Sequence, residues 1–310
     1  MIDRCFTHCP GVGPETDRML RLRGFHNWEQ CIRNRNILPL GESRKSSFIM
    51  SLEESMSAMH DNDIGFFVKK FPVREHWRIL ATWFEDATFF DIETTGLSRY
   101  YSECSVITAY SQGEMHLFLY DENLDGFLDL VSGSRLLVSF NGTCFDLPFL
   151  EKTFSIPEID CPHVDLRWVA YHCGMRGGLK TIERKMNYTR PEEIADITGF
   201  EAVDLFYRWQ GGETRAMELL AGYCMADTVS TMLIAEKIMK KMGVPLEDSD
   251  PLELFTRAAR IASCADRHNE PARIAVADPG MPGHIVKSQA ERRRKIMAMR
   301  NGASAELKGL

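Results

Sequence analysis

Residues 87–97 are the stretch that most constrains the fold; they read Ala-Thr-Phe-Phe-Asp-Ile-Glu-Thr-Thr-Gly-Leu. β-Branched and aromatic residues dominate the first half, which predicts a half-buried strand. Because side chains alternate along a strand, Asp91 and Glu93 point to one face. Neighbouring buried carboxylates raise each other's pKa, and a divalent cation would relieve that repulsion. Gly96 then permits a sharp, closely approached turn. The alternative is a plain strand ending in a polar turn.

The composition of the 310-residue chain is that of a globular protein with a net charge of −7. This charge does not indicate nucleic-acid binding, but it does not exclude a local basic patch. The nine cysteines form no C-x-x-C pair, so we expect reduced thiols rather than disulfides or a zinc site. The N-terminus lacks the apolar region of a secretory signal. No apolar run approaches the roughly 20 residues that span a bilayer. We therefore expect a cytoplasmic protein with no membrane partner.

The N-terminal segment, residues 1–46, carries the pattern Pro-Gly-Val-Gly-Pro at residues 10–14. Pro14 is expected to begin a helix that Gly24 ends, and Asn27 to cap a second helix. The pattern resembles the hairpin of a helix-hairpin-helix element. That resemblance implies that backbone N–H groups at Gly11 and Gly13 hold a DNA phosphate. The alternative is an ordinary helical hairpin packed on the main domain. Residues 37–47 are expected to be a linker, followed by a helix from Phe48 to Met59.

Residues 62–242 are expected to form the main domain. The sequence predicts a short strand at 64–68, a helix at 73–84, and then the Asp91 strand. A hairpin of strands at 105–110 and 115–120 follows, then a helix at 124–131, an apolar strand at 135–140 that fits a parallel position, and a short strand at 161–164. The expected fold class is α/β: a ribonuclease H-like mixed sheet, with three antiparallel strands and then parallel strands, flanked by helices.

Two further acids stand in recognisable settings downstream of the first pair. Asp146 follows the 135–140 strand where a helix begins, which aims its side chain over the sheet edge; the alternative is a helix N-cap. Tyr223 and Asp227 are four residues apart on a long, largely apolar helix at 214–242, so they share one face. A carboxylate on such a face needs a partner.

In order, these residues resemble the three motifs of the DEDD 3′→5′ exonucleases: Asp91-x-Glu93, Asn141-x3-Phe145-Asp146 and Tyr223-x3-Asp227. Tyr223 in the third motif is similar to the Tyr branch of this family. The His branch would need His at position 222, where this chain has Gly222. The wider pattern, including Gly-Leu-Lys-Thr-Ile-Glu at residues 178–183, looks like the predicted exonucleases of the YprB-like ribonuclease H-like family. The similarity covers about 180 residues.

The resemblance implies that Asp91, Glu93, Asp146 and Asp227 hold two Mg²⁺ or Mn²⁺ ions, for which carboxylates are suitable hard ligands. Asp91 would bridge both ions, Glu93 and Asp227 would share one of them, and Asp146 would act through a water. Tyr223 would position the attacking water. The alternative is that Tyr223 is an aromatic side chain of the core without a role in the site.

Further residues are expected to contact the substrate. Thr94, Thr95 and Gly96 would bind the terminal nucleotide, with Leu97 against its base. Asn141 and Phe145 would line the same groove. Lys180 either holds a phosphate or is an ordinary solvated lysine. Asp165 is interpreted as a capping residue or as a support for the four acids.

The C-terminal region, residues 243–310, is expected to hold a linker to residue 251, a helix at 252–265 and a basic tail. Residues 271–310 contain eight Lys/Arg and three Asp/Glu, a net of about +5. Such a tail either binds a nucleic-acid backbone or is a solvated chain end.

The sequence thus predicts a metal-dependent 3′→5′ exonuclease that acts at the 3′ ends of nucleic acid, with DNA favoured over RNA as the substrate. One alternative is a structure-specific endonuclease or RNA-processing nuclease that uses the same acids. Another is a nucleic-acid-binding module with a vestigial nuclease site.

Overall fold

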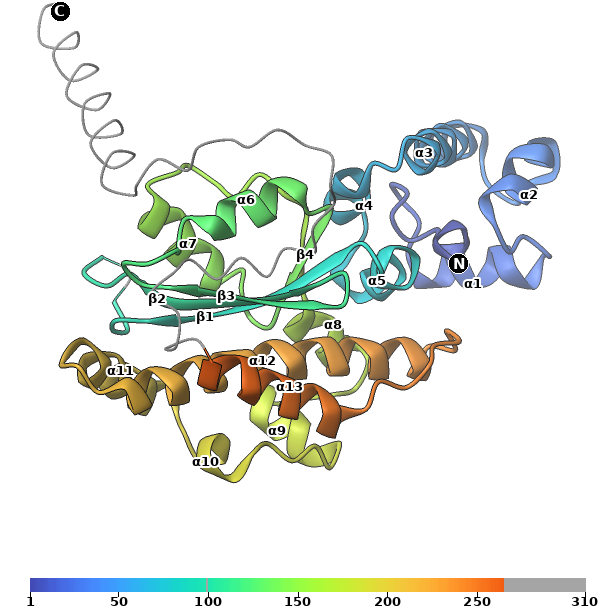
Figure 1. The fold of residues 1–310 in the computed structure, drawn as a ribbon. Helices are drawn as coiled ribbons and strands as arrows, with labels where there is room; N and C mark the ends of the chain where they lie inside the picture. The colour runs from blue at the N-terminus through green and yellow to red at the C-terminus, as the bar shows by residue number, and fades with distance from the viewer. Residues whose placement is uncertain (99, 265–310) are drawn as a thin grey trace, which may run out of the picture. The chain divides into compact units, whose positions relative to one another are not determined.

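The computed structural model describes residues 1–98 and 100–264, which contain a five-stranded mixed sheet (Figure 1). The strand order is β3-β2-β1-β4-β5, with β1 at Ala87–Thr94, β2 at Cys104–Ser111, β3 at Glu114–Leu119, β4 at Leu136–Ser139 and β5 at His163–Asp165. β1 to β3 pair antiparallel, whereas β4 pairs parallel with both β1 and β5. This confirms the predicted α/β class and strand directions. The carboxyl ends of β1, β4 and β5 therefore meet at one edge of the sheet.

Helices cover both faces of this sheet (Figure 1). On one face lie α6 (Gly126–Gly133) and α7 (Asp146–Phe154). The other face is crossed by α12 (Thr214–Lys241), on which α13 (Pro251–Cys264) packs. Between β5 and α12 the chain forms α8 (Leu166–His172), α9 (Leu179–Lys185), α10 (Glu192–Ala195) and α11 (Gly199–Gln210). α12 and α13 lie close to their predicted bounds.

The alternation of β1 explains why its acids face α12. Phe90 and Ile92 are buried in the apolar cluster that α6 and α7 cover. Phe89 belongs to the larger cluster on the other face, which includes most of α12. Because successive side chains point to opposite faces, Asp91 and Glu93 share the Phe89 side. The apolar pattern of this strand therefore aims both carboxylates at one helix.

The first 84 residues are helical. They comprise η1 (Ile2–Arg4), α1 (Pro14–Leu22), α2 (Trp28–Arg33), η2 (Arg35–Ile37), α3 (Glu42–His60), α4 (Ile64–Lys70), η3 (Val73–Glu75) and α5 (Trp77–Trp83). Pro14 begins α1, Gly24 follows its end with φ +87°, and Asn27 caps α2, as predicted. Aromatic contacts join these helices: the ring centroids of Trp28 and Phe67 are 6.2 Å apart, and those of Phe67 and Trp83 are 5.4 Å apart.

Two predictions in this region are wrong. The strand expected at 64–68 is helix α4, because the Asp63 side chain caps it and Ile64, Phe67 and Phe71 are buried at helical spacing. The linker expected at 37–47 overlaps helix α3, which begins at Glu42. Arg44 on its first turns donates a hydrogen bond of 2.7 Å to the Gly11 carbonyl.

The basic tail expected from residue 271 lies outside the described residues. Within residues 1–98 and 100–264, none of the helices combines the length and the apolar character that crossing a membrane requires.

Candidate active site

A cleft at the carboxyl edge of β1 and β4 brings most of the predicted site residues together. It holds about 580 Å³ of space, part of it open solvent, and its lining includes all four predicted acids. The acids come from three elements, since Asp91 and Glu93 lie on β1, Asp146 on α7 and Asp227 on α12. The remaining lining residues are Ile92, Thr94, Leu97, Phe140, Asn141, Phe145 and Gly199.

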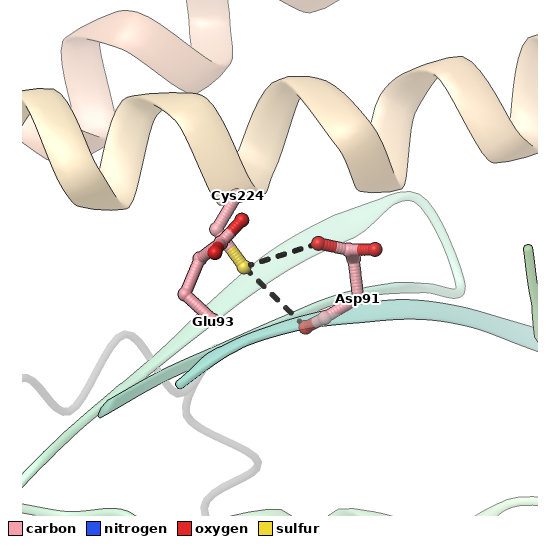
Figure 2. A group of neighbouring side chains, drawn as sticks. All are labelled: Asp91, Glu93 and Cys224. Carbon is pink, nitrogen blue, oxygen red and sulfur yellow. Dashed lines mark hydrogen bonds between the residues drawn. The ribbon is translucent and has the colours of Figure 1, made fainter. Parts of the chain in front are cut away.

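Asp91 and Glu93 both approach Cys224 of α12 (Figure 2). The carboxylate oxygens of the two acids and the Cys224 sulfur lie within 4.8 Å of one another, a grouping that could hold a metal ion. The Cys224 sulfur lies 3.4 Å from the Asp91 carbonyl oxygen and 3.6 Å from Asp91 Oδ2. The thiol is fully buried, and burial next to Asp91 raises its pKa well above the usual range. It therefore stays protonated and donates to Asp91.

Asp146 is the first residue of α7 and is only 3% exposed. The alternative that it caps this helix is wrong, because the N-cap is Phe145. Its Oδ1 atom is buried and finds no hydrogen-bond partner within residues 1–98 and 100–264. Burial, with repulsion from Asp165 and Asp227, raises the pKa of Asp146 to about 8. A buried oxygen without a partner is where a bound ion or water is expected.

Asp227 pairs with a residue that the sequence analysis did not single out, Arg190. The Arg190 guanidinium forms buried ion pairs with Asp227 and with Glu183, and its Nε lies 3.1 Å from each Glu183 oxygen. Burial raises the pKa of Asp227, and the charge of Arg190 opposes that shift. In the sequence, the indication of such a cation was Glu183, because an acid on an apolar helix face needs a positively charged partner.

Burial and mutual repulsion both disfavour the charged forms of the acids in the cleft. Burial first, and then Asp227 and Asp146, raise the pKa values of Asp91 and Glu93 well above their ordinary range. Lys180 and Arg190 only partly offset this for Glu93. Further positive charge in the cleft would therefore favour the ionised forms of these acids.

Tyr223 and Lys180 stand beside these acids and are not part of the cleft lining. The Lys180 ammonium lies 4.5 Å from the centre of the Tyr223 ring and donates to the Ile197 carbonyl. Lys180 is thus half-buried in the first turn of α9 rather than an ordinary solvated lysine. Burial and the charges of Asp227, Glu93 and Asp91 raise the pKa of Tyr223, so its hydroxyl remains protonated.

The turn after β1 is tightly organised. The Thr94 hydroxyl donates to the Gly96 carbonyl at 2.8 Å. The Thr95 N–H donates to the Glu103 carbonyl at 2.9 Å, and the Glu103 N–H donates to the Thr95 hydroxyl at 3.1 Å. A Cβ at position 96 would lie 2.7 Å from the Ser102 hydroxyl, so a larger residue there would force that hydroxyl to move. Leu97 is 74% exposed at the cleft, whereas Thr95 and Gly96 are not among the residues that line it.

Asp165 organises the second turn of the cleft. Its carboxylate accepts from the backbone N–H groups of Asn141 at 2.9 Å and Thr143 at 3.3 Å, and caps α8 through Arg167 N at 3.1 Å. The capping role predicted for Asp165 is confirmed. Asn141 has φ +74°, and its side-chain oxygen accepts from the Arg167 guanidinium at 2.6 Å.

Gly11 and Gly13 do not line the cleft. Gly13 is the N-cap of α1, and Gly11 has φ +75°. The first turn of α1 carries Glu15 and Asp17, and the Asp17 carboxylate is paired with the Arg21 guanidinium at 2.8 Å.

A family model matches the part of the chain that forms the sheet and α12. Residues 88–239 match the model of the RNase_H superfamily. A solved structure of the family B DNA polymerase from the hyperthermophilic archaeon Pyrobaculum calidifontis is 17% identical, with a TM-score of 0.41. The match covers 56% of this chain and only 27% of the polymerase chain. No curated protein matches the chain. The match to the RNase_H superfamily thus extends from β1 to α12, and the mixed five-stranded sheet is consistent with an RNase H-like fold.

Proposed function

We propose that this chain is a metal-dependent 3′→5′ exonuclease that hydrolyses phosphodiester bonds of nucleic acid, DNA in the first place. The observation that carries the proposal is the meeting of Asp91, Glu93, Asp146 and Asp227 in one cleft. Their order along the chain, with Tyr223 four residues before Asp227, resembles the Tyr branch of the DEDD exonucleases and the YprB-like family.

The donor set of the cleft fits two Mg²⁺ or Mn²⁺ ions. All four acids supply hard oxygen atoms, and Asp146 Oδ1 is buried without a partner in the described part of the chain. Cations would also lower the raised pKa values of Asp91 and Glu93. When bound, such ions generate a nucleophile from water near neutral pH and stabilise the charge that develops on the phosphate oxygens.

The side chains around the acids have supporting tasks in this proposal. Tyr223, protonated because its pKa is raised, donates a hydrogen bond that orients the attacking water. Thr94, Leu97, Asn141 and Phe145 line the cleft and hold the terminal nucleotide. Thr95 and Gly96 shape the turn that carries Leu97. Lys180 adds positive charge beside Tyr223.

The remaining parts of the chain are assigned by the same proposal. Residues 62–242 form the exonuclease domain, residues 1–46 a helix-hairpin-helix-like element, and residues 243–310 a C-terminal helix and basic tail. Contact of Gly11 and Gly13 with a DNA backbone, and a cytoplasmic location, belong to this proposal as well.

The test uses single-stranded and duplex DNA and RNA labelled at either end, incubated with Mg²⁺, Mn²⁺ or EDTA. We expect shortening from the 3′ end that requires the metal. Asp91→Asn should lower the rate by more than about 100-fold, because it alters a metal ligand itself. Asp129→Asn, an exposed acid on α6, is the matched control and should cleave normally.

Other patterns of cleavage would change the assignment. Internal cuts would indicate an endonuclease, and cleavage of RNA alone an RNA-processing enzyme. Absence of cleavage, together with no heat of Mg²⁺ or Mn²⁺ binding in calorimetry, would contradict the proposal and favour a binding module.

A further inference from the structure

Residues 166–186 form a basic stretch in an acidic chain. They hold five Lys/Arg and one Glu, a net of +4, whereas the whole chain has a net charge of −7. The stretch covers α8 and α9. Arg167 and Arg176 are exposed, and no carboxylate of residues 1–98 and 100–264 lies within the 4.0 Å of an ion pair from either guanidinium. Their positive charge is therefore available to an anionic ligand.

The same stretch exposes two aromatic rings next to these guanidinium groups. Trp168 is 42% exposed and Tyr171 is 44% exposed. The Arg167 guanidinium lies 5.5 Å from the centre of the Trp168 ring, and that of Arg176 lies 4.9 Å from the Tyr171 ring. Alternating aromatic and basic side chains are what a groove for single-stranded nucleic acid requires, since bases stack on the rings and phosphates pair with the cations.

This surface continues into the cleft. α8 begins directly after β5, whose carboxyl end lies on the same sheet edge as those of β1 and β4. The Arg167 guanidinium donates at 2.6 Å to the side-chain oxygen of Asn141, which lines the cleft. A guanidinium has five N–H donors, so this bond leaves others for a phosphate. A strand that enters the cleft along this edge would first cross α8.

We propose that Arg167, Trp168, Tyr171 and Arg176 form a platform that binds single-stranded nucleic acid on the 5′ side of the nucleotide in the cleft. The two rings are 6.3 Å apart and inclined by 70°, so one flat base does not cover both, and each ring takes its own base. This inference rests on the proposed function and deepens it. It names unpaired strands as the substrate class, because bases inside a duplex present no free face to these rings.

The test measures binding rather than cleavage. The full chain is titrated in EDTA against a fluorescent single strand of about 12 nucleotides, within the usual range of site sizes, and against a blunt duplex. We expect the single strand to bind more tightly than the duplex. Trp168→Ala/Tyr171→Ala should weaken single-strand binding by about tenfold or more. Trp168→Phe/Tyr171→Phe, which keeps both ring faces, should restore most of it.

Two further variants make the result specific. Phe200→Ala removes an aromatic side chain that is 78% exposed and follows Gly199 of the cleft lining; it should bind within about twofold of the unmodified chain. Arg167→Ala/Arg176→Ala should reduce the slope of log K against log salt by about 1.4, or about 0.7 for each lost phosphate contact.

Equal binding by the Trp168→Ala/Tyr171→Ala variant and the unmodified chain would overturn the platform, as would loss of binding in Phe200→Ala alone. Either result leaves the exonuclease proposal standing if Asp91→Asn still loses cleavage. Conversely, if the chain binds single strands through this platform but does not cleave them, only the proposed activity is contradicted.

Discussion

Arg190 sets the charge balance behind the four acids. It is 7% exposed and shared between Glu183 and Asp227. Asp227 is thereby neutralised on one side while its carboxylate still lines the cleft. Removing the guanidinium would leave two buried acids without their partner, which is among the costliest changes a protein interior can undergo.

We therefore expect Arg190→Ala to lower the free energy of unfolding by about 3–5 kcal/mol in EDTA. Mg²⁺ should restore only part of the loss, because an ion in the cleft compensates Asp227 and not Glu183. Urea unfolding with and without Mg²⁺ measures both effects. Arg208→Ala, which breaks an exposed pair with Glu213, should cost less than about 1 kcal/mol. Equal losses for the two variants would contradict this reading of Arg190.

The acids of the cleft were predictable from the sequence, and Arg190 was not. Asp91 and Glu93 follow an apolar strand, and Tyr223 and Asp227 are spaced by one helical turn, so local periodicity places each pair. Arg190 lies in the segment between α9 and α10, and its two partners are 7 and 37 residues away. Only the folded backbone brings these three side chains together.

At the scale of elements, the carboxylate of Asp165 joins the end of β5, the turn after β4 and the start of α8. Asp165 accepts three backbone hydrogen bonds from these segments, and the turn it holds leads directly to Asp146. We expect Asp165→Ala to lower the free energy of unfolding by about 1–3 kcal/mol, since it leaves backbone donors unpaired, and to impair cleavage as well.

The matched control for Asp165→Ala is Asp160→Ala, an exposed acid just before β5. Thermal unfolding and the rate on a 3′-labelled strand should be unchanged in that variant. Normal cleavage by Asp165→Ala would mean that Asp146 is held by α7 alone.

The strands were easier to predict than the N-terminal helices. β1 and β2 carry β-branched or aromatic residues and β4 is an apolar run, and these patterns agree with the final surroundings of the strands. The segment 64–68 carries the same residue types, but the Asp63 cap and the aromatic neighbours of Phe67 select a helix. Tertiary packing overrides strand propensity there. The polar residues 42–47 looked like a linker because their helix exposes most of that first turn.

At the scale of the whole molecule, α12 is covered by α13 as well as by the sheet. Phe255, Ala258 and Ala262 of α13 are each 2% exposed. A Cβ placed on Gly222 of α12 would lie 3.7 Å from the Ala262 Cβ, so the two helices approach closely on small residues. The helix that carries Tyr223 and Asp227 therefore depends on α13 for part of its burial.

A chain that ends at Gly243 should be less stable than one that ends at Cys264 by at least about 3 kcal/mol, the cost of removing a single buried Phe side chain. Urea midpoints and solubility of the two chains measure this difference. Coinciding midpoints would show that α12 needs no cover on this side and that α13 is dispensable.

The burial of α12 also decides how the site can move. Every residue from Leu220 to Glu236 is buried, so no fraying of the helix ends reaches Asp227. Amide hydrogens around Tyr223 and Asp227 should exchange with solvent only when the whole domain unfolds, whereas those near the exposed Leu97 should exchange through local openings. We therefore expect Asp227, one of the proposed metal-binding acids, to belong to the slowest-exchanging core, and a substrate to be admitted by movement of the surface turns around it.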